Sequence, residues 1–100
     1  MTINKKIDGD TMTISVEGWL DTMTAPQFHD EVQDLSGAKN VILDFGGLEY
    51  ISSAGLREIV TLYHTVSAQD GAFSIRKINP EVMDVFTLTG FDKKLGLQDD

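Results

Sequence analysis

The chain has 100 residues, which suffice for one domain with a single hydrophobic core, and we expect one domain over residues 1–100. Its apolar fraction of 41% is ordinary for a globular protein, and the lack of cysteine excludes disulfides, thiol chemistry and thiolate metal sites. The formal charge of −8 argues against binding to nucleic acid or to anionic membrane surfaces, both of which need clustered Lys and Arg.

The N-terminal residues predict a β-hairpin. Residues 2–7 alternate loosely between apolar and polar side chains, and the Asp-Gly-Asp sequence at residues 8–10 is typical of a tight turn. In residues 11–17 every second side chain is apolar, which indicates a half-buried strand that residues 18–21 close. Two antiparallel strands therefore open the fold.

A helix and a central strand are expected next. Pro26 is favoured in the first turn of a helix, and the Ser-Gly pair at residues 36–37 ends it. The apolar face of this helix is expected to comprise Ala25, Phe28, Val32 and Leu35. The apolar strand at residues 39–44 suggests cover on both faces, and a short turn at the diglycine of residues 46–47 separates it from a second apolar patch at residues 48–51.

The period of the apolar residues changes after this patch. They recur at three- and four-residue steps, which predicts a helix that starts at Ser52 or Ser53 and ends near residues 67–71. Its apolar face is expected to comprise Leu56, Ile59, Val60, Tyr63 and Val66. Residues 72–78 then predict a further strand.

The C-terminal part predicts a third helix. It starts at Asn79 and Pro80, and the Thr-Gly-Phe sequence at residues 89–91 ends it. Its inward-facing residues are expected to be Val82, Met83, Val85, Phe86 and Leu88. A short added strand fits residues 94–97, and the acidic tail at residues 98–100 is expected to fray.

The resulting order, β-β-α-β-α-β-α, predicts an α/β fold. Strand–helix–strand connections favour parallel pairing with right-handed crossovers, whereas the hairpin pairs antiparallel. We therefore expect a mixed sheet of four to five strands with helices packed on it.

Two serines occupy the predicted strand-to-helix junction. Ser52 can cap the helix with its side-chain oxygen, which leaves Ser53 in the first turn with its hydroxyl outward. A phosphate there would meet the positive end of the helix. Gly55, which has no Cβ, would let a partner's backbone approach. On the residues alone a simple cap is favoured over a modification site, because caps are common and phosphorylation sites are not.

The junction also resembles a family motif. Residues 52–56, Ser-Ser-Ala-Gly-Leu, are similar to the acidic-Ser-Ser/Thr-Gly-Leu motif of STAS domains, in particular of the small anti-sigma factor antagonists of bacterial partner-switching systems. That family has the same order of elements, so the resemblance implies a STAS-like single domain. It also implies phosphorylation at Ser53, with Ser52 as the second choice. The partner-binding residues that it implies are Asp21, Ser52, Ser53, Ala54, Gly55 and Leu56.

This chain differs from the family's pattern at two positions of the motif. Ser52 stands where the better-known members have Asp, and Ala54 replaces a second hydroxyl. Asp21 follows Gly-Trp-Leu and resembles the family's Gly-x-Leu-Asp, so a role in partner recognition and a role as a cap are both open. Trp19 is either an interface anchor or a core residue, and partial burial is expected.

The resemblance further implies the partners. The unphosphorylated protein is expected to bind an anti-sigma factor with serine kinase activity, to be released on phosphorylation of Ser53, and to be restored by a serine phosphatase. It would be a substrate and not an enzyme, without cofactor or metal, and a monomer when free. No apolar run reaches the roughly 20 residues of a membrane-spanning helix and no signal-peptide core is present, so we expect a cytoplasmic protein without membrane insertion.

The Asp-to-Ser difference at position 52 favours an alternative. The chain would then be a constitutive, non-phosphorylated STAS subunit of a transport, lipid-trafficking or signalling complex. A third hypothesis, a small enzyme, needs a convergent polar pocket that the sequence does not display.

The remaining polar residues indicate no active site. Asp44 and Glu49 flank the diglycine, but no nucleophile, base and oxyanion set accompanies them. His29 and His64 fall on different predicted helices, which disfavours a metal site, and the diglycine lacks the Lys-Ser/Thr end of a phosphate-binding loop. Arg57 is either an exposed first-turn residue or a contact for a phosphate at the junction.

Overall fold

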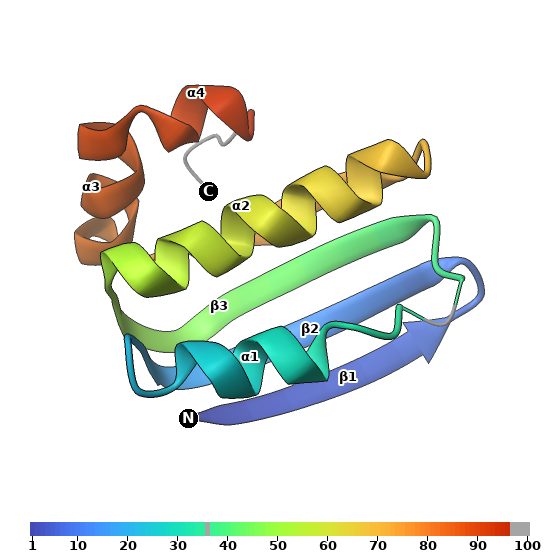
Figure 1. Ribbon diagram of the computed structural model, residues 1–100, viewed down its shortest axis with the longest axis horizontal. Coiled ribbons are helices and arrows are strands. Elements are labelled where there is room, and N and C mark those ends of the chain that lie inside the picture. Colours follow the sequence, from blue (N-terminus) through green and yellow to red (C-terminus); the bar gives the residue numbers. More distant parts are fainter. Residues whose placement is uncertain (36, 97–100) are drawn as a thin grey trace.

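A computed structural model describes residues 1–35 and 37–96 and shows in them a four-stranded sheet with helices packed on it (Figure 1). The strands are β1 (Thr2–Asp8), β2 (Thr11–Leu20), β3 (Asn40–Ile51) and β4 (Ala72–Arg76), in that order across the sheet. The helices are α1 (Ala25–Glu31), α2 (Ser53–Ala68), α3 (Pro80–Thr89) and α4 (Phe91–Lys94). β1 pairs antiparallel with β2, whereas β2 with β3 and β3 with β4 pair parallel. The predicted mixed α/β fold is confirmed.

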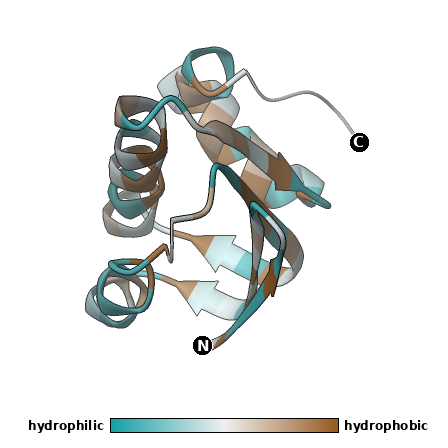
Figure 2. Cartoon of the chain, turned by 90° about the vertical axis from the view of Figure 1, so that its right-hand side faces the viewer, coloured by the Kyte–Doolittle hydropathy of each residue, from teal (hydrophilic) through white to brown (hydrophobic). Residues whose placement is uncertain are grey.

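The hydrophobic core lies between the sheet and the two helices α1 and α2, which occupy the same side of it (Figures 1 and 2). Alternation in β2 buries Met12, Ile14 and Val16, as predicted. α1 contributes Phe28 to this core, and α2 contributes Leu56, Ile59, Leu62 and Val66. Leu62 was missing from the predicted apolar face, although it lies three residues after Ile59 and belongs to the same helical stripe.

β3 differs from its prediction in two respects. Its first half buries only alternate residues, since Val41, Leu43 and Phe45 are buried whereas Ile42 and Asp44 are half-buried, so cover on both faces was wrong. The turn expected at the diglycine was also wrong, because the diglycine lies inside β3, a continuous strand of 12 residues.

Irregular pairing with β2 explains how one strand passes through the diglycine. The register between the two strands shifts between Ser15 and Glu17 and again between Gly18 and Trp19. At each shift β3 carries one more residue than β2, which is the arrangement of a β-bulge, and glycine is common at bulges. β3 thereby reaches the start of α2 without leaving the sheet.

α1 is shorter than predicted. It ends at Glu31, with Val32 as its C-cap, and not at residues 36–37. Val32 and Leu35 are nevertheless buried, because the chain that follows the helix still packs on the core. The spacing of apolar residues therefore predicted correctly which side chains are buried, but not the residue at which the helix ends. Ser36 lies outside the described residues.

α3 begins at the predicted residues. The side chain of its N-cap, Asn79, accepts a hydrogen bond from the Val82 N–H at 2.8 Å and donates one to the Leu48 carbonyl at 2.8 Å. The helix ends at Gly90, whose φ of 80° is left-handed as such caps usually are. Leu88, predicted to face inward, is 87% exposed, because it lies about 200° around the helix from the buried Phe86.

Two further predictions about the C-terminal part are corrected. β4 ends at Arg76, two residues before the predicted limit of 78. The strand expected at residues 94–97 is wrong for its described part, because Lys94 closes α4 and Leu95 is that helix's C-cap. Leu97 and the acidic tail at residues 98–100 lie outside the described residues.

Candidate functional site

Ser52 and Ser53 form the junction between β3 and α2. Ser52 has an extended backbone (φ −96°, ψ 175°), and its Oγ accepts a hydrogen bond from the Gly55 N–H at 3.3 Å, as an N-cap does. Its own N–H donates to the Leu20 carbonyl at 2.9 Å, which fixes the junction to the end of β2. Ser53 is the first residue of α2 and is exposed. The predicted division between a capping serine and an outward serine is confirmed.

The start of α2 is electrostatically suited to a negative group. The helix has 16 residues, and no acidic residue lies in its first turn. The backbone dipoles therefore leave a partial positive charge at Ser53 that no side chain of that turn offsets. A negative charge placed there is stabilised by about 0.3–1 kcal/mol. Arg57, one turn further along, is exposed, which agrees with its interpretation as an exposed residue near the start of the helix.

The predicted partner-binding residues differ in their exposure. Ser53 is exposed, Asp21, Ser52 and Ala54 are half-buried, and Gly55 and Leu56 are buried. A Cβ on Gly55 would come within 2.5 Å of the Leu20 carbonyl oxygen and 2.8 Å of the Leu20 Cγ. The missing side chain of Gly55 therefore has an internal function: it lets α2 start directly against the end of β2.

Asp21 lies in the loop between β2 and α1 and organises that loop. Its Oδ1 accepts hydrogen bonds from the N–H groups of Met23 at 3.0 Å and Thr24 at 3.1 Å, and its own N–H donates to the Thr24 Oγ1 at 2.9 Å. The N-cap of α1 is Thr24 and no side chain caps that helix, so Asp21 holds the turn before the helix and is not its cap. The loop also adjoins the serine junction, since the neighbouring Leu20 bonds to Ser52 through its carbonyl.

Trp19 is more exposed than predicted. Its side chain is 56% exposed, and its ring lies 5.4 Å, centroid to centroid, from that of Tyr50 at an angle of 48°. The two residues are register partners near the ends of β2 and β3. This pair therefore stands on the surface close to the serine junction.

Loss of the Ser52 side chain should cost the fold a cap. Ser52→Ala is expected to lower the free energy of unfolding by about 1 kcal/mol, because the Gly55 N–H loses its acceptor. Urea denaturation followed by circular dichroism measures this. Ser53→Ala is the matched control and should leave stability within about 0.5 kcal/mol of wild type. Equal stability of Ser52→Ala and wild type would contradict the capping assignment.

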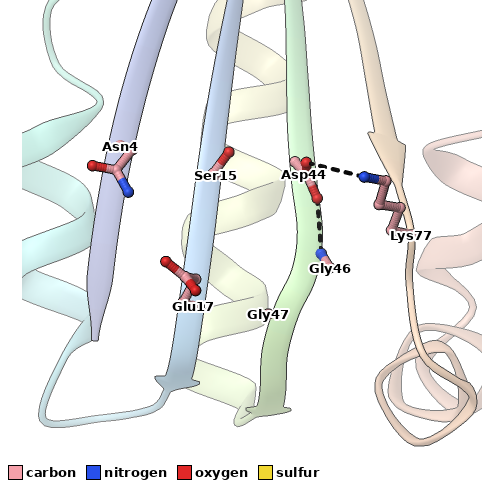
Figure 3. Close-up of a pocket in the computed structure, with 7 residues that line it drawn as sticks. All are labelled: Asn4, Ser15, Glu17, Asp44, Gly46, Gly47 and Lys77. Atoms are coloured by element: carbon pink, nitrogen blue, oxygen red, sulfur yellow. Dashed lines mark hydrogen bonds and ion pairs between the residues drawn. The ribbon is translucent and has the colours of Figure 1, made fainter.

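The sheet also carries a hollow on the face opposite to α1 and α2 (Figure 3). It is lined by Asn4, Ser15, Glu17, Asp44, Gly46, Gly47 and Lys77. Asp44 accepts a hydrogen bond from the Gly46 N–H at 2.9 Å and lies 3.8 Å from the Lys77 ammonium, so it supports the bulged strand. Glu49 lines a different hollow with Asn79 and Glu81, so the two acidic residues that flank the diglycine do not share a site.

The two histidines lie apart. His29 contacts Glu58 at 2.8 Å and links α1 to α2, whereas the His64 ring lies next to that of Tyr63. Among the described residues no three His, Cys, Asp or Glu side chains are grouped so as to hold a metal ion. None of the helices in the described part of the chain has the length and apolar character needed to cross a membrane.

These features define an α/β domain in which an exposed serine opens a helix beside the end of a parallel strand. The chain belongs to the STAS domain family, whose model matches residues 2–100. A protein of Bordetella bronchiseptica assigned as the anti-sigma factor antagonist BtrV is 34% identical over 88 residues, which cover 86% of this chain and 75% of that protein.

Solved structures agree with this assignment. A Thermotoga maritima protein described as an anti-sigma factor antagonist is similar with a TM-score of 0.84 at 26% identity, over 91% of this chain and 80% of that chain. An anti-sigma factor antagonist from Mycobacterium paratuberculosis has the same fold, with a TM-score of 0.85 at 22% identity over 93% of this chain and 80% of that chain.

Proposed function

We propose that this protein is an anti-sigma factor antagonist whose binding is switched by phosphorylation of Ser53. The unphosphorylated form binds an anti-sigma factor that is also a serine kinase, and thereby frees the factor that the kinase restrains. The kinase transfers a phosphoryl group from ATP to the Ser53 hydroxyl, and a serine phosphatase removes it again. The observation that carries this proposal is the exposure of Ser53 at the start of α2, while Ser52 provides the cap.

The structure of the junction supports a modification that changes binding without unfolding the domain. A phosphate adds about −1.5 to −2 charges and three acceptor oxygens. Within the domain it meets the positive end of α2, where it is tolerated. In a closely packed interface the same group loses water and faces the partner's surface, which costs several kcal/mol when it is unpaired. Because each 1.4 kcal/mol changes affinity tenfold, this cost is enough to dissociate the complex.

The remaining parts of the proposal follow from the same mechanism. The protein is the substrate of the kinase and catalyses no step itself, it needs no cofactor, and it acts in the cytoplasm, where ATP and the sigma factor are found. We include Asp21, in the loop after Leu20, and Ala54, next to Ser53, in the surface that the partner covers. The buried Gly55 and Leu56 contribute by fixing the position of the helix start.

Phosphate mapping tests the proposal. Each anti-sigma factor of the source organism that has a kinase domain is purified and mixed with the protein and ATP. The products are then analysed by mass spectrometry. We expect one phosphate per chain on Ser53, none on Ser53→Ala, and unchanged modification of Ser52→Ala. If none of these kinases modifies either serine, the proposed phosphorylation switch is wrong. If only Ser52 is modified, the switch residue is Ser52 and not Ser53.

One observation favours a second candidate. Ser52 uses its side-chain oxygen as a cap in the place where better-known members of the family have a carboxylate, so a negative group is missing beside the modified hydroxyl. A constitutive subunit of a transport, lipid-trafficking or signalling complex needs no such group. Affinity purification from cells distinguishes the two, because it recovers either a serine kinase or a transporter component.

A further inference from the structure

Two aromatic side chains stand uncovered near the ends of the strands that lead to the serine junction. Trp19 of β2 and Tyr50 of β3 are register partners with ring centroids 5.4 Å apart, and they are 56% and 46% exposed. The next residue on each strand, Leu20 or Ile51, is buried. Because successive side chains of a strand point to opposite faces, the aromatic pair lies on the face of the sheet away from α1 and α2.

A third exposed apolar side chain lies in the loop that follows β2. Met23 is 86% exposed, and its loop is bound to β2 by the hydrogen bond from the Thr24 Oγ1 to the Trp19 carbonyl at 2.9 Å. We call Trp19, Met23 and Tyr50 the aromatic patch. Burying large side chains is favourable by about 25 cal/mol per Å², so leaving them in water forgoes stability that the core would have supplied. Trp and Tyr are the residues most enriched among the anchors of protein interfaces.

The patch lies close to the serine junction along the chain. The residue after Trp19, Leu20, accepts the hydrogen bond of the Ser52 N–H at 2.9 Å, and Tyr50 precedes Ser52 by two residues. A stable protein interface buries about 800 Å² on each partner, far more than one helix start presents. A partner seated on Ser53 must therefore cover further surface, and the aromatic patch offers exposed apolar side chains on the strands that lead to it.

Charge indicates the chemistry of the partner. The residues beside the patch in the chain include Glu17, Asp21 and Glu49, and the whole chain carries a charge of −8. An apolar centre with a charged rim is the usual anatomy of an interface. The complementary surface is an apolar cleft flanked by Lys or Arg, which an acidic rim attracts and orients.

We propose that the aromatic patch is the anchor by which the anti-sigma factor kinase binds, through such a basic-rimmed apolar cleft. This inference rests on the proposed function and extends it. Ser53 supplies the switch, and the side chains of Trp19 and Tyr50 supply anchoring contacts.

Variant affinities test this inference. The kinase that modifies Ser53 is titrated with each variant without ATP, by isothermal titration calorimetry. Trp19→Ala is expected to weaken binding by roughly 30-fold and Tyr50→Ala by roughly 10-fold, the range for interface anchors. Ile7→Ala is the matched control, since Ile7 is 55% exposed but pairs with Met12 at the hairpin end of the sheet, and it should bind within about twofold of wild type (Figure 1). Far-UV circular dichroism checks that each variant is folded.

Fluorescence supplies a second measurement. Trp19 is the single tryptophan of the chain, so its emission reports directly on the patch when the kinase used is a tryptophan-free variant. We expect a blue shift on binding of the unphosphorylated protein and none on addition of kinase to the phosphorylated protein. Trp19→Phe, which keeps an aromatic ring, should retain affinity to within about fivefold.

The outcomes separate this inference from the proposed function. If the kinase binds and modifies Ser53 but Trp19→Ala and Tyr50→Ala bind as wild type does, the anchor is overturned and the switch stands. If no kinase binds the wild-type protein, the proposed function fails and the anchor fails with it. If sedimentation shows a dimer that Trp19→Ala converts to a monomer, the patch pairs two copies of this chain and the anchor is likewise overturned.

Discussion

Ser53→Asp is expected to weaken the complex with the anti-sigma factor kinase by at least about 100-fold, while Ser53→Ala binds as wild type does. The carboxylate reproduces part of a phosphate's charge at an exposed position that a bound partner would cover. A charge left unpaired in a dry interface costs about 3 kcal/mol or more, which corresponds to a factor of 100 or more in affinity. Calorimetric titration of the kinase with the two variants measures the difference.

Stability measurements on the same variants separate a switch from an unfolding effect. The free energy of unfolding of Ser53→Asp should lie within about 0.5 kcal/mol of the wild-type value or slightly above it. The reason is that α2 has no acidic residue in its first turn and its dipole favours a negative group there. Weak binding by a variant that is equally stable locates the effect at the interface. Full binding by Ser53→Asp would show instead that the partner leaves Ser53 in water.

Local chemistry made much of the fold predictable. Alternation in β2, the hairpin turn and the two capping residues Ser52 and Asn79 depend on short-range geometry, which one sequence displays. The parallel pairing of β3 with both of its neighbours followed from strand–helix–strand connections. These features need no knowledge of distant contacts.

Features that depend on tertiary contacts were not predictable in this way. Two glycines between apolar patches predict a turn, and only the pairing with β2 shows that Gly46 and Gly47 lie in a bulged strand. Apolar spacing continued α1 past Glu31, because Val32 and Leu35 are buried without being helical. Leu88 was predicted to face inward, although its angular position on α3 is opposite to that of Phe86, which helical spacing in the sequence already indicates.

The candidate site likewise has features that were predictable from local sequence and features that depend on tertiary contacts. The roles of Ser52 and Ser53 follow from helix capping and were available from the residues. The burial of Gly55 and the exposure of Trp19 were not, since both depend on how β2 and α2 meet. Gly55 was interpreted as an opening for a partner, whereas its space is filled by Leu20 of the same chain.

Gly55→Ala is expected to lower the free energy of unfolding by about 2 kcal/mol, with a fall in Tm of roughly 10 °C. In an ordinary helix the same change stabilises, because alanine has the higher helix propensity. Here the new Cβ would stand 2.5 Å from the Leu20 carbonyl oxygen, which is main chain and cannot rotate away. Either β2 or the start of α2 must move. Such a movement also strains the hydrogen bond from the Ser52 N–H to the Leu20 carbonyl. Calorimetric melting measures the loss.

Ser53→Ala is the control for this prediction, because it adds alanine two residues earlier in the same helix at an exposed position and should melt close to wild type. A Gly55→Ala protein as stable as wild type would show that the junction yields easily. In that case the position of Ser53 is not rigidly held by β2. The predicted loss, in contrast, means that the fold itself fixes the hydroxyl in place before any partner binds, so that a phosphate on Ser53 meets the partner's surface and is not carried aside by a moving helix end.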